Sequence, residues 1–177
     1  MRKLGWSLAI IAIVLLAAFN TIMLLGWKLP ESHVVKRSMV LKRAPADVWN
    51  AVSDFSHETD WRTDLKSVER LPDQNGEPVW RENYKHMGPE TLATAMTVPG
   101  VYMVRTITNP SGMMAGSWEY SVQPWGKDTK VTITEHGDIR NPFWRYLSAK
   151  IFKYRWIDDY LRMLAAKFHE PAKITSS

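Results

Sequence analysis

The chain of 177 residues contains no cysteine. Structural disulfides, thiolate metal ligands and cysteine nucleophiles are therefore excluded, while the redox compartment stays open. The Gly-x-Ser-x-Gly nucleophile elbow, the phosphate-binding loop and the glycine-rich dinucleotide fingerprint are also missing. One polar stretch lacks the His-x-x-x-His spacing that places two imidazoles on one helix face, so we interpret it as a solvated cluster: it holds His57, Glu58, Asp60 and Asp64. We expect neither a metal nor a cofactor.

The sequence also lacks a dense run of charge of one sign. Its 23 basic and 18 acidic residues give a net charge of +5, but the basic residues are scattered. A nucleic-acid-binding protein would carry a basic stripe and a motif that reads bases, so we expect no nucleic-acid partner. The positive balance instead favours anionic surfaces, including lipid headgroups.

An uncharged apolar run, Leu4–Leu25, is long enough to cross a hydrocarbon layer, which takes roughly 20 helical residues. Trp6 and Trp27 bracket it about 30 Å apart, which matches two interfacial aromatic belts. The alternative is a cleaved signal peptide, but the run is long for one and no Ala-x-Ala cleavage site follows. We predict a single-pass cell-membrane anchor over residues 1–27, a short linker over residues 28–32, a ligand-binding domain over residues 33–170 and a C-terminal tail over residues 171–177.

Charge alone does not decide the orientation of this anchor. Arg2, Lys3 and the free amine precede the apolar run, but the other flank carries several basic residues, so the positive-inside rule is close to balance; these are Lys28, Lys36, Arg37, Lys42 and Arg43. A minimal charged tail before a long apolar run resembles an uncleaved signal anchor. We therefore favour an extracytoplasmic domain.

From residue 33 onward the pattern is that of an α+β domain. A first strand is predicted at Val34–Lys42, followed by a short helix from Ala44 and a second short helix or turn over Asp54–Arg62. Turn-forming residues then separate six further predicted strands: Leu65–Leu71, Pro78–Tyr84, Thr91–Val98, Tyr102–Thr108, Ser117–Gln123 and Lys130–His136.

The chain ends in a stretch, Asn141–Glu170, that is predicted to form one long amphipathic helix. Asn141 is a good N-cap, and Pro142 suits the first helical position. Large apolar residues recur every three or four positions and would share one face: Phe143, Leu147, Ile151, Tyr154, Ile157, Leu161, Leu164 and Phe168. Such a face needs a broad apolar partner, which the strands supply.

This order of elements, with several short motifs, resembles the START-like helix-grip (SRPBCC) superfamily, in its polyketide cyclase/dehydrase and lipid-transport branch. The resemblance covers about Val34–Phe168, and the motifs are Ala44-Pro45-Ala46-Asp47-Val48-Trp49, Ser53-Asp54-Phe55 with Trp61, Gly116-Ser117-Trp118-Glu119-Tyr120 and Thr132-Ile133-Thr134-Glu135. It implies a helix-grip fold, in which a curved antiparallel sheet wraps around the long C-terminal helix. It also implies an apolar cavity between the two for a lipid, a polyketide or another hydrophobic ligand. It implies no single reaction, because members of the superfamily range from carriers to cyclases.

Aromatic and acidic side chains are the candidates for lining this cavity. The aromatic candidates, which could equally be core residues, are Trp49, Trp61, Trp80, Tyr84, Trp118 and Tyr120. Strand alternation puts Glu82 on one face with Trp80 and Tyr84, and puts Glu135 on one face with Val131 and Ile133. Glu82, Glu135, Arg105 and His136 could orient a ligand or move a proton if buried. The alternative for them is a cross-strand ion pair or a solvated rim.

Two methionines, Met113 and Met114, lie between the glycines of the loop Gly112–Gly116. Flexible thioethers on a hinged loop suit a cavity gate or a membrane-touching tip, although the loop could also fold onto the core.

These features predict a membrane-anchored protein that binds a hydrophobic small molecule or lipid without covalent chemistry. One alternative is a cyclase or dehydratase that uses a buried Glu or His. Another is an envelope interaction module whose cavity is filled by its own side chains. The sequence singles out no catalytic residue, and an enzyme is the less favoured class.

Overall fold

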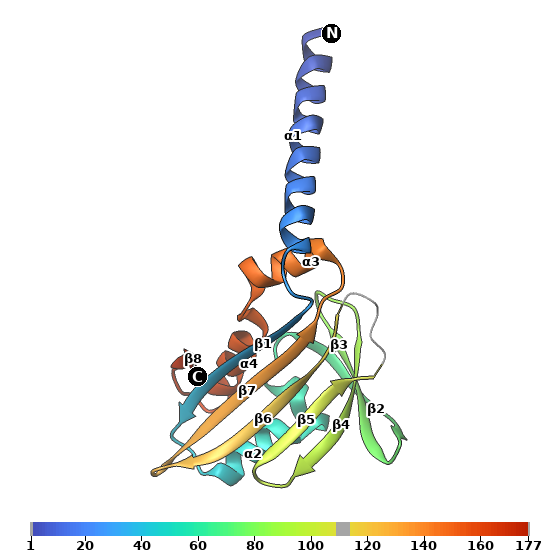
Figure 1. Ribbon diagram of the computed structural model, residues 1–177. Helices are drawn as coiled ribbons and strands as arrows, with labels where there is room; N and C mark the ends of the chain where they lie inside the picture. The colour runs from blue at the N-terminus through green and yellow to red at the C-terminus, as the bar shows by residue number, and fades with distance from the viewer. Residues whose placement is uncertain (1, 109–113, 177) are drawn as a thin grey trace.

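A computed structural model describes residues 2–108 and 114–176 of the chain (Figure 1). The first helix, α1 (Arg2–Trp27), projects from one end of an α+β domain. Its segment Trp6–Trp27 has a mean hydropathy of 2.7 and is long and apolar enough to cross a membrane, a property that an N-terminal signal sequence would share.

The domain is built on one antiparallel sheet of eight strands, in the order β2-β3-β4-β5-β6-β7-β1-β8. The strands are β1 (Ser32–Leu41), β2 (Leu65–Gln74), β3 (Glu77–Tyr84), β4 (Glu90–Val98), β5 (Tyr102–Ile107), β6 (Ala115–Trp125), β7 (Asp128–Asp138) and β8 (Ile174–Ser176). The first seven lie where the sequence predicted strands. The eighth comes from the predicted C-terminal tail, where Ile174 and Ser176 pair with Met39 and Arg37 of β1.

Two short helices connect β1 to β2. The first, α2 (Pro45–Ser53), has Pro45 in its first turn and buries Val48, Trp49 and Val52. The second, η1 (Phe55–Asp60), is a 3₁₀-helix that buries Phe55 and Glu58. Both lie where the sequence predicted short helices.

The prediction of one long C-terminal helix is wrong, because the segment is broken. It forms α3 (Pro142–Leu147), a π-helical turn η2 (Ser148–Phe152) and then α4 (Arg155–Lys167). The predicted N-cap is confirmed, since Asn141 accepts hydrogen bonds from the backbone N–H groups of Phe143 and Trp144, at 3.0 and 3.3 Å.

The break follows from the two different partners of this segment. In α4, Ile157, Leu161 and Leu164 are buried in the core that it forms with the sheet. In α3, the ring of Phe143 instead packs on Phe19 of α1, with 5.7 Å between ring centroids. A straight helix cannot follow partners in two directions, and the irregular turn between α3 and α4 absorbs the change.

The sheet curves around α4 and encloses the core on its concave face (Figure 1). The α+β helix-grip architecture expected from the sequence is therefore confirmed. Inward positions alternate along the strands, as in β7, where Val131, Ile133 and Glu135 are buried.

Candidate functional site

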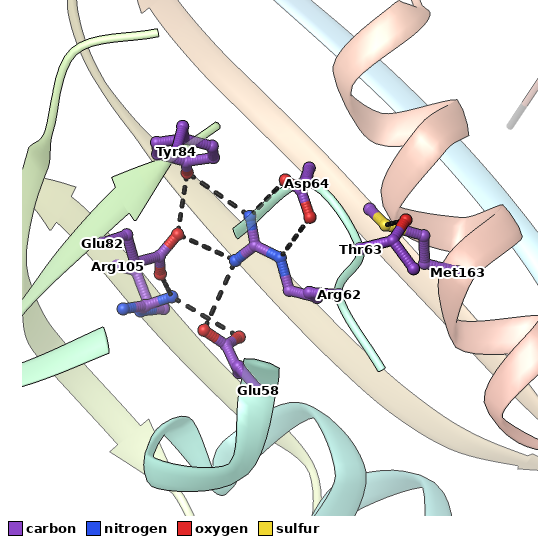
Figure 2. Close-up of polar contacts among 8 residues, drawn as sticks. All are labelled: Glu58, Arg62, Thr63, Asp64, Glu82, Tyr84, Arg105 and Met163. Atoms are coloured by element: carbon purple, nitrogen blue, oxygen red, sulfur yellow. Dashed lines mark hydrogen bonds and ion pairs between the residues drawn. The ribbon is translucent and has the colours of Figure 1, made fainter. Parts of the chain in front are cut away.

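Four buried charged side chains meet on the concave face of the sheet (Figure 2). Glu58 lies in η1, Arg62 follows that helix, Glu82 lies in β3 and Arg105 lies in β5. Their exposed fractions are 0%, 5%, 1% and 1%, in that order. We call these four residues the ion cluster.

Glu82 is the centre of the ion cluster. Its Oε2 accepts a hydrogen bond from Arg62 Nη1 at 2.8 Å and from the Tyr84 hydroxyl at 2.7 Å, and its Oε1 accepts from Arg105 Nη1. Arg62 Nη1 also donates to Glu58 Oε2 at 3.3 Å, and its Nη2 donates to Asp64 at 2.9 Å. One carboxylate therefore joins two arginines and a tyrosine.

Local structure explains why these side chains converge. The alternation of β3 turns Glu82 inward, on the same face as Trp80 and Tyr84. The spacing of four residues between Glu58 and Arg62 lets them pair across one helical turn. Arg105 faces inward because its register partner, Trp118 of β6, lies on the concave face with Glu135.

The two carboxyl groups have opposite electrostatic environments. Burial and then the negative charge of Glu82 raise the pKa of Glu58 to about 8. Burial also opposes ionisation of Glu82, but Arg105 and Arg62 outweigh it and lower the pKa of Glu82 to about 2. At neutral pH the ion cluster therefore holds two guanidinium groups, an ionised Glu82 and a largely protonated Glu58.

Several buried polar atoms around the ion cluster have no hydrogen-bond partner among the described residues. They are Glu58 Oε1, Arg105 Nε, Arg105 Nη2, Thr94 Oγ1 and the Tyr160 hydroxyl. Native interiors pair almost all such groups with protein or water, so these atoms mark places where a bound polar group would be stabilised.

Aromatic rings surround these unpaired atoms. The Arg105 guanidinium lies 4.1 Å from the ring centroid of Phe55. The Tyr160 ring packs edge-on against Trp61 and Tyr120, with centroids 5.2 and 5.5 Å apart. The concave face therefore combines apolar area with convergent polar groups, the usual composition of a site for a small apolar ligand.

A second inward-facing group lies on β1, β6 and β7. Glu135 accepts hydrogen bonds from His33 Nε2 at 3.0 Å and from Trp118 Nε1 at 3.1 Å, and its exposed fraction is 5%. The carboxylate fixes the histidine ring. His136, by contrast, faces the outside, with its Nε2 3.0 Å from Glu119.

The predicted cavity residues lie in different parts of the structure. Trp49, Trp61 and Tyr120 are buried in the hydrophobic core, and Trp80, Tyr84 and Trp118 are half-buried on the concave face. Two pairs of candidates are in direct contact: Tyr84 with Glu82, and Trp118 with Glu135. Met114 is half-buried next to the start of β6, while Met113 lies outside the described residues.

These contacts show that Glu82 is held in ion pairs with two arginines, which matches one of the sequence-based alternatives, whereas Glu135 is held by hydrogen bonds from His33 and Trp118. A hollow of about 200 Å³ lies on the opposite, outer face of the sheet, among polar side chains that include Lys36, Glu119 and Lys130. It is not the predicted cavity. Between the sheet and α4 lie the buried side chains of the hydrophobic core and, beside them, the ion cluster.

The interpretation of residues 57–64 as a solvated cluster is wrong for Glu58, which is fully buried. His57 does lie at the surface, where it pairs with Asp54 at 2.8 Å. No group of metal-ligating side chains occurs among the described residues. Arg62 and Tyr160 were not among the predicted site residues, although the four-residue spacing of Glu58 and Arg62 beside Trp61 is a signal in the sequence.

Comparison with known sequences identifies the family. The sequence profile described as "Polyketide cyclase / dehydrase and lipid transport" matches residues 32–168, most of the chain. The chain belongs to this family. No curated protein matches the sequence.

Several solved structures share this fold. The polyketide cyclase/dehydrase and lipid-transport chain superposes on the Zhui aromatase/cyclase of Streptomyces sp. R1128 with a TM-score of 0.65 and 14% identity, covering 78% of this chain and 94% of the other. A START superfamily protein of Mycobacterium smegmatis gives 0.62 and 15%, with 77% and 97% covered. A truncated norcoclaurine synthase of Thalictrum flavum gives 0.62 and 10%, with 79% and 96% covered. At these identities the likeness shows the fold alone.

Proposed function

We propose that this family member is a membrane-anchored binding protein that holds a hydrophobic small molecule or lipid between the sheet and α4, without covalent chemistry. The observation that carries the proposal is the set of unpaired buried polar atoms at the ion cluster, enclosed by aromatic rings. A ligand with an apolar body and one polar end could pack against the aromatic rings and pair with the polar atoms.

The polar end would bind at Arg105, Glu58 and Tyr160. An unpaired buried polar group costs about 1–3 kcal/mol, so a ligand group that pairs with several of these atoms gains affinity from each. A hydroxyl or a carbonyl can use the Arg105 donors, and a hydroxyl can also donate to Glu58. The apolar body would displace or reorient half-buried rings such as Trp80 and Trp118.

The membrane anchor is part of the proposal, and the packing of α1 supports it against a removable signal sequence. Arg145 of α3 is buried and donates to the carbonyls of Gly26 and Leu29, at 3.4 and 3.1 Å. Loss of residues 1–27 would remove part of this pairing and strip Phe143 of its contact with Phe19. The short charged tail before a long apolar run, which resembles an uncleaved signal anchor, favours a domain outside the cytoplasm.

The test is mass spectrometry of the molecules that co-purify with three proteins: the full wild-type chain and its variants Arg105→Lys and Arg81→Lys. The first variant keeps the charge beside Glu82 but removes the guanidinium donors, and the second is a matched change at an exposed arginine of β3. We expect an apolar molecule with a polar group, chemically unchanged on incubation, in the wild type and Arg81→Lys, and its loss in Arg105→Lys. The same molecules in equal amount on all three proteins would contradict the proposal.

A second candidate function, an enzyme of the cyclase or dehydratase type, is favoured by one observation. A carboxyl group with a pKa of about 8, such as Glu58, can donate and accept protons near neutral pH. Under the enzyme hypothesis, the ligand would be recovered in cyclised or dehydrated form, and Glu58→Gln would abolish this conversion while binding persists. Such a result would favour the enzyme over the binding protein. A wild-type protein that carries no ligand would favour the third hypothesis, an interaction module filled by its own side chains.

A further inference from the structure

The segment formed by α3 and η2 carries an apolar face that the sheet does not cover. At about 100° per residue in α3, Phe143, Trp144 and Leu147 fall within about 100° of one another around the helix, and Ile151 follows Leu147 by about one turn in η2. Ile151 is 62% exposed, Trp144 is also exposed, and Leu147 is half-buried. Arg145 points to the opposite side and is buried.

Phe143 shows which way this face points. Its ring packs on Phe19 of α1. Phe19 lies eight residues before the end of α1, which is about 12 Å along the helix axis. Because Phe19 belongs to the apolar segment Trp6–Trp27, the face that contains Phe143 turns toward the last turns of that segment.

The joint between α1 and α3 fixes this arrangement. Figure 1 shows α3 lying across the base of α1. Besides Gly26 and Leu29, Arg145 binds Glu31 at 2.8 Å and the carbonyls of Ile139 and Arg140 at 2.9 and 2.8 Å. A Cβ atom on Gly26 would overlap the carbonyl oxygen of Pro142, so only glycine permits this close approach. The domain therefore meets α1 at a set angle rather than on a free tether.

Basic side chains accompany the apolar face. Lys28 follows α1, and Lys150 and Lys153 lie in and next to η2; all three are exposed. The nearby carboxylate of Glu31 is paired with Arg145. Tryptophan, aliphatic and lysine side chains on one short helical segment are typical of helices that lie in a lipid headgroup layer.

We propose that α3 and η2 form a second membrane-contact element, which lies in the headgroup layer of the bilayer that α1 crosses and binds anionic phospholipid there. Trp144, Leu147 and Ile151 enter the boundary of the acyl chains, and Lys150 and Lys153 contact lipid phosphates. The inference rests on the proposed anchoring by α1. It adds that the domain docks on the membrane in one orientation.

The absence of cysteine allows a direct test with single spin labels on the full chain. Labels at Ile151→Cys, Leu15→Cys and Lys127→Cys report on η2, on α1 and on the β6–β7 turn, which lies at the far end of the domain (Figure 1). Each protein is reconstituted in vesicles of phosphatidylcholine and phosphatidylglycerol. Collision of each label with oxygen, which concentrates in lipid, is compared with collision with a water-soluble nickel chelate.

We expect the labels at 15 and 151 to favour oxygen and the label at 127 to favour nickel. In phosphatidylcholine alone, the label at 151 should shift toward nickel while the label at 15 does not. Suppose that the label at 15 lies in lipid but the label at 151 is as accessible to nickel as the label at 127. That result would overturn this inference and leave the anchor intact. A label at 15 in water would overturn the anchor and the inference with it.

Two further outcomes would also overturn the inference. Dipolar broadening at 151, with protection from both collision partners, would mean that a second copy of the chain covers the face. Equal immersion at 151 in both kinds of vesicle would remove the role of anionic phospholipid.

Discussion

Glu58 and Glu82 share the same two arginines, yet their pKa values move in opposite directions. The difference comes from distance: Glu82 has short contacts to both guanidinium groups, whereas Glu58 Oε1 lies 3.9 Å from Arg105 and forms no hydrogen bond. Burial therefore dominates at Glu58, and charge attraction dominates at Glu82. At neutral pH, Glu58 is therefore mostly protonated and Glu82 is ionised. Each carboxyl group should make its own contribution to the pH dependence of stability.

We predict that Glu58→Gln stabilises the protein at alkaline pH. The pKa of Glu58 is about 8 in the folded protein and 4.5 in the unfolded chain. Between pH 4.5 and pH 8, wild-type Glu58 must therefore take up a proton when the protein folds. Its contribution to the free energy of unfolding therefore falls as pH rises from 4.5 to 8. Glutamine mimics the protonated carboxyl group and removes this loss, which is worth at least about 1 kcal/mol at pH 8, since one pKa unit corresponds to about 1.4 kcal/mol.

Thermal unfolding of the full chain in detergent, scanned from pH 4.5 to 9, measures this effect. The two proteins should coincide near pH 4.5 and diverge as pH rises. Glu69→Gln, a change at an exposed carboxylate of β2, is the control and should follow the wild type. A Glu58→Gln protein that is less stable than the wild type at pH 8 would mean that Glu58 is ionised in the folded state.

Glu82→Gln should have the opposite effect. It leaves Arg62 and Arg105 buried without their shared carboxylate, and the loss of one partner of a buried pair costs about 3–5 kcal/mol. Because the folded pKa of about 2 lies below the unfolded value of 4.5, this contribution is present above pH 4.5 and is lost as pH falls toward 2. Denaturant unfolding at pH 7 and pH 3 should show a large difference from the wild type at pH 7 and a smaller one at pH 3. A variant as stable as the wild type at pH 7 would contradict the central role of Glu82.

The sequence predicted the inward direction of Glu82 but not its partners. Strand alternation is local, so the shared face of Trp80, Glu82 and Tyr84 could be predicted from three positions. The approach of Arg62 and Arg105 depends on where η1 and β5 lie in three dimensions. No spacing along the chain encodes that distance, and a polar run such as His57–Asp64 looks solvated until the fold buries one of its members.

Among the elements, strands were easier to predict than the C-terminal helices. Each strand is bounded by turn residues such as Pro99-Gly100 and Gly126, and its periodicity of two is a property of the strand itself. The apolar spacing of residues 143–168 is equally regular, but it does not reveal that Phe143 meets α1 while Leu161 meets the sheet. Periodicity identifies a buried face, whereas the identity of the partner decides whether the helix stays straight.

The joint between α1 and α3 gives a prediction at the scale of elements. Gly26→Leu should force α1 away from α3, because a side chain at that position overlaps the backbone of Pro142. Distances between spin labels at Leu16→Cys and Lys36→Cys, measured by pulsed electron resonance in vesicles, should change from a narrow to a broad distribution. Ala12→Leu, at an exposed position of the same helix, is the control and should keep the narrow distribution. Narrow, unshifted distances in Gly26→Leu would mean that the joint does not set the angle.

At the scale of the whole molecule, three parts are linked in series: an apolar helix, a joint with a buried arginine, and a domain whose core holds an ion cluster. The joint connects to β1 through residues 28–31 and to β7 through residues 139–141. The strands that carry His33 and Glu135 therefore begin or end at the joint. A membrane-docked domain would present this end of its concave face to the lipid, which would give an apolar ligand a short path between the bilayer and the proposed binding site.

This arrangement predicts how the domain behaves without α1. A protein of residues 28–177 should unfold cooperatively, because its core belongs to the sheet and α4, and Leu161 and Leu164 have no contact with water. It should nevertheless bind vesicles that contain phosphatidylglycerol, since removal of α1 exposes Phe143 beside Trp144 and Ile151. Sedimentation with vesicles should show this binding, and Trp144→Ser with Ile151→Ser should abolish it. Trp125→Ser, a loss of an exposed tryptophan at the far end of the domain, should leave it unchanged.

Two outcomes would contradict this prediction. A truncated protein that aggregates, while the full chain in detergent unfolds cooperatively, would show that α1 is needed for folding. A truncated protein that folds but does not bind vesicles would confine membrane contact to α1.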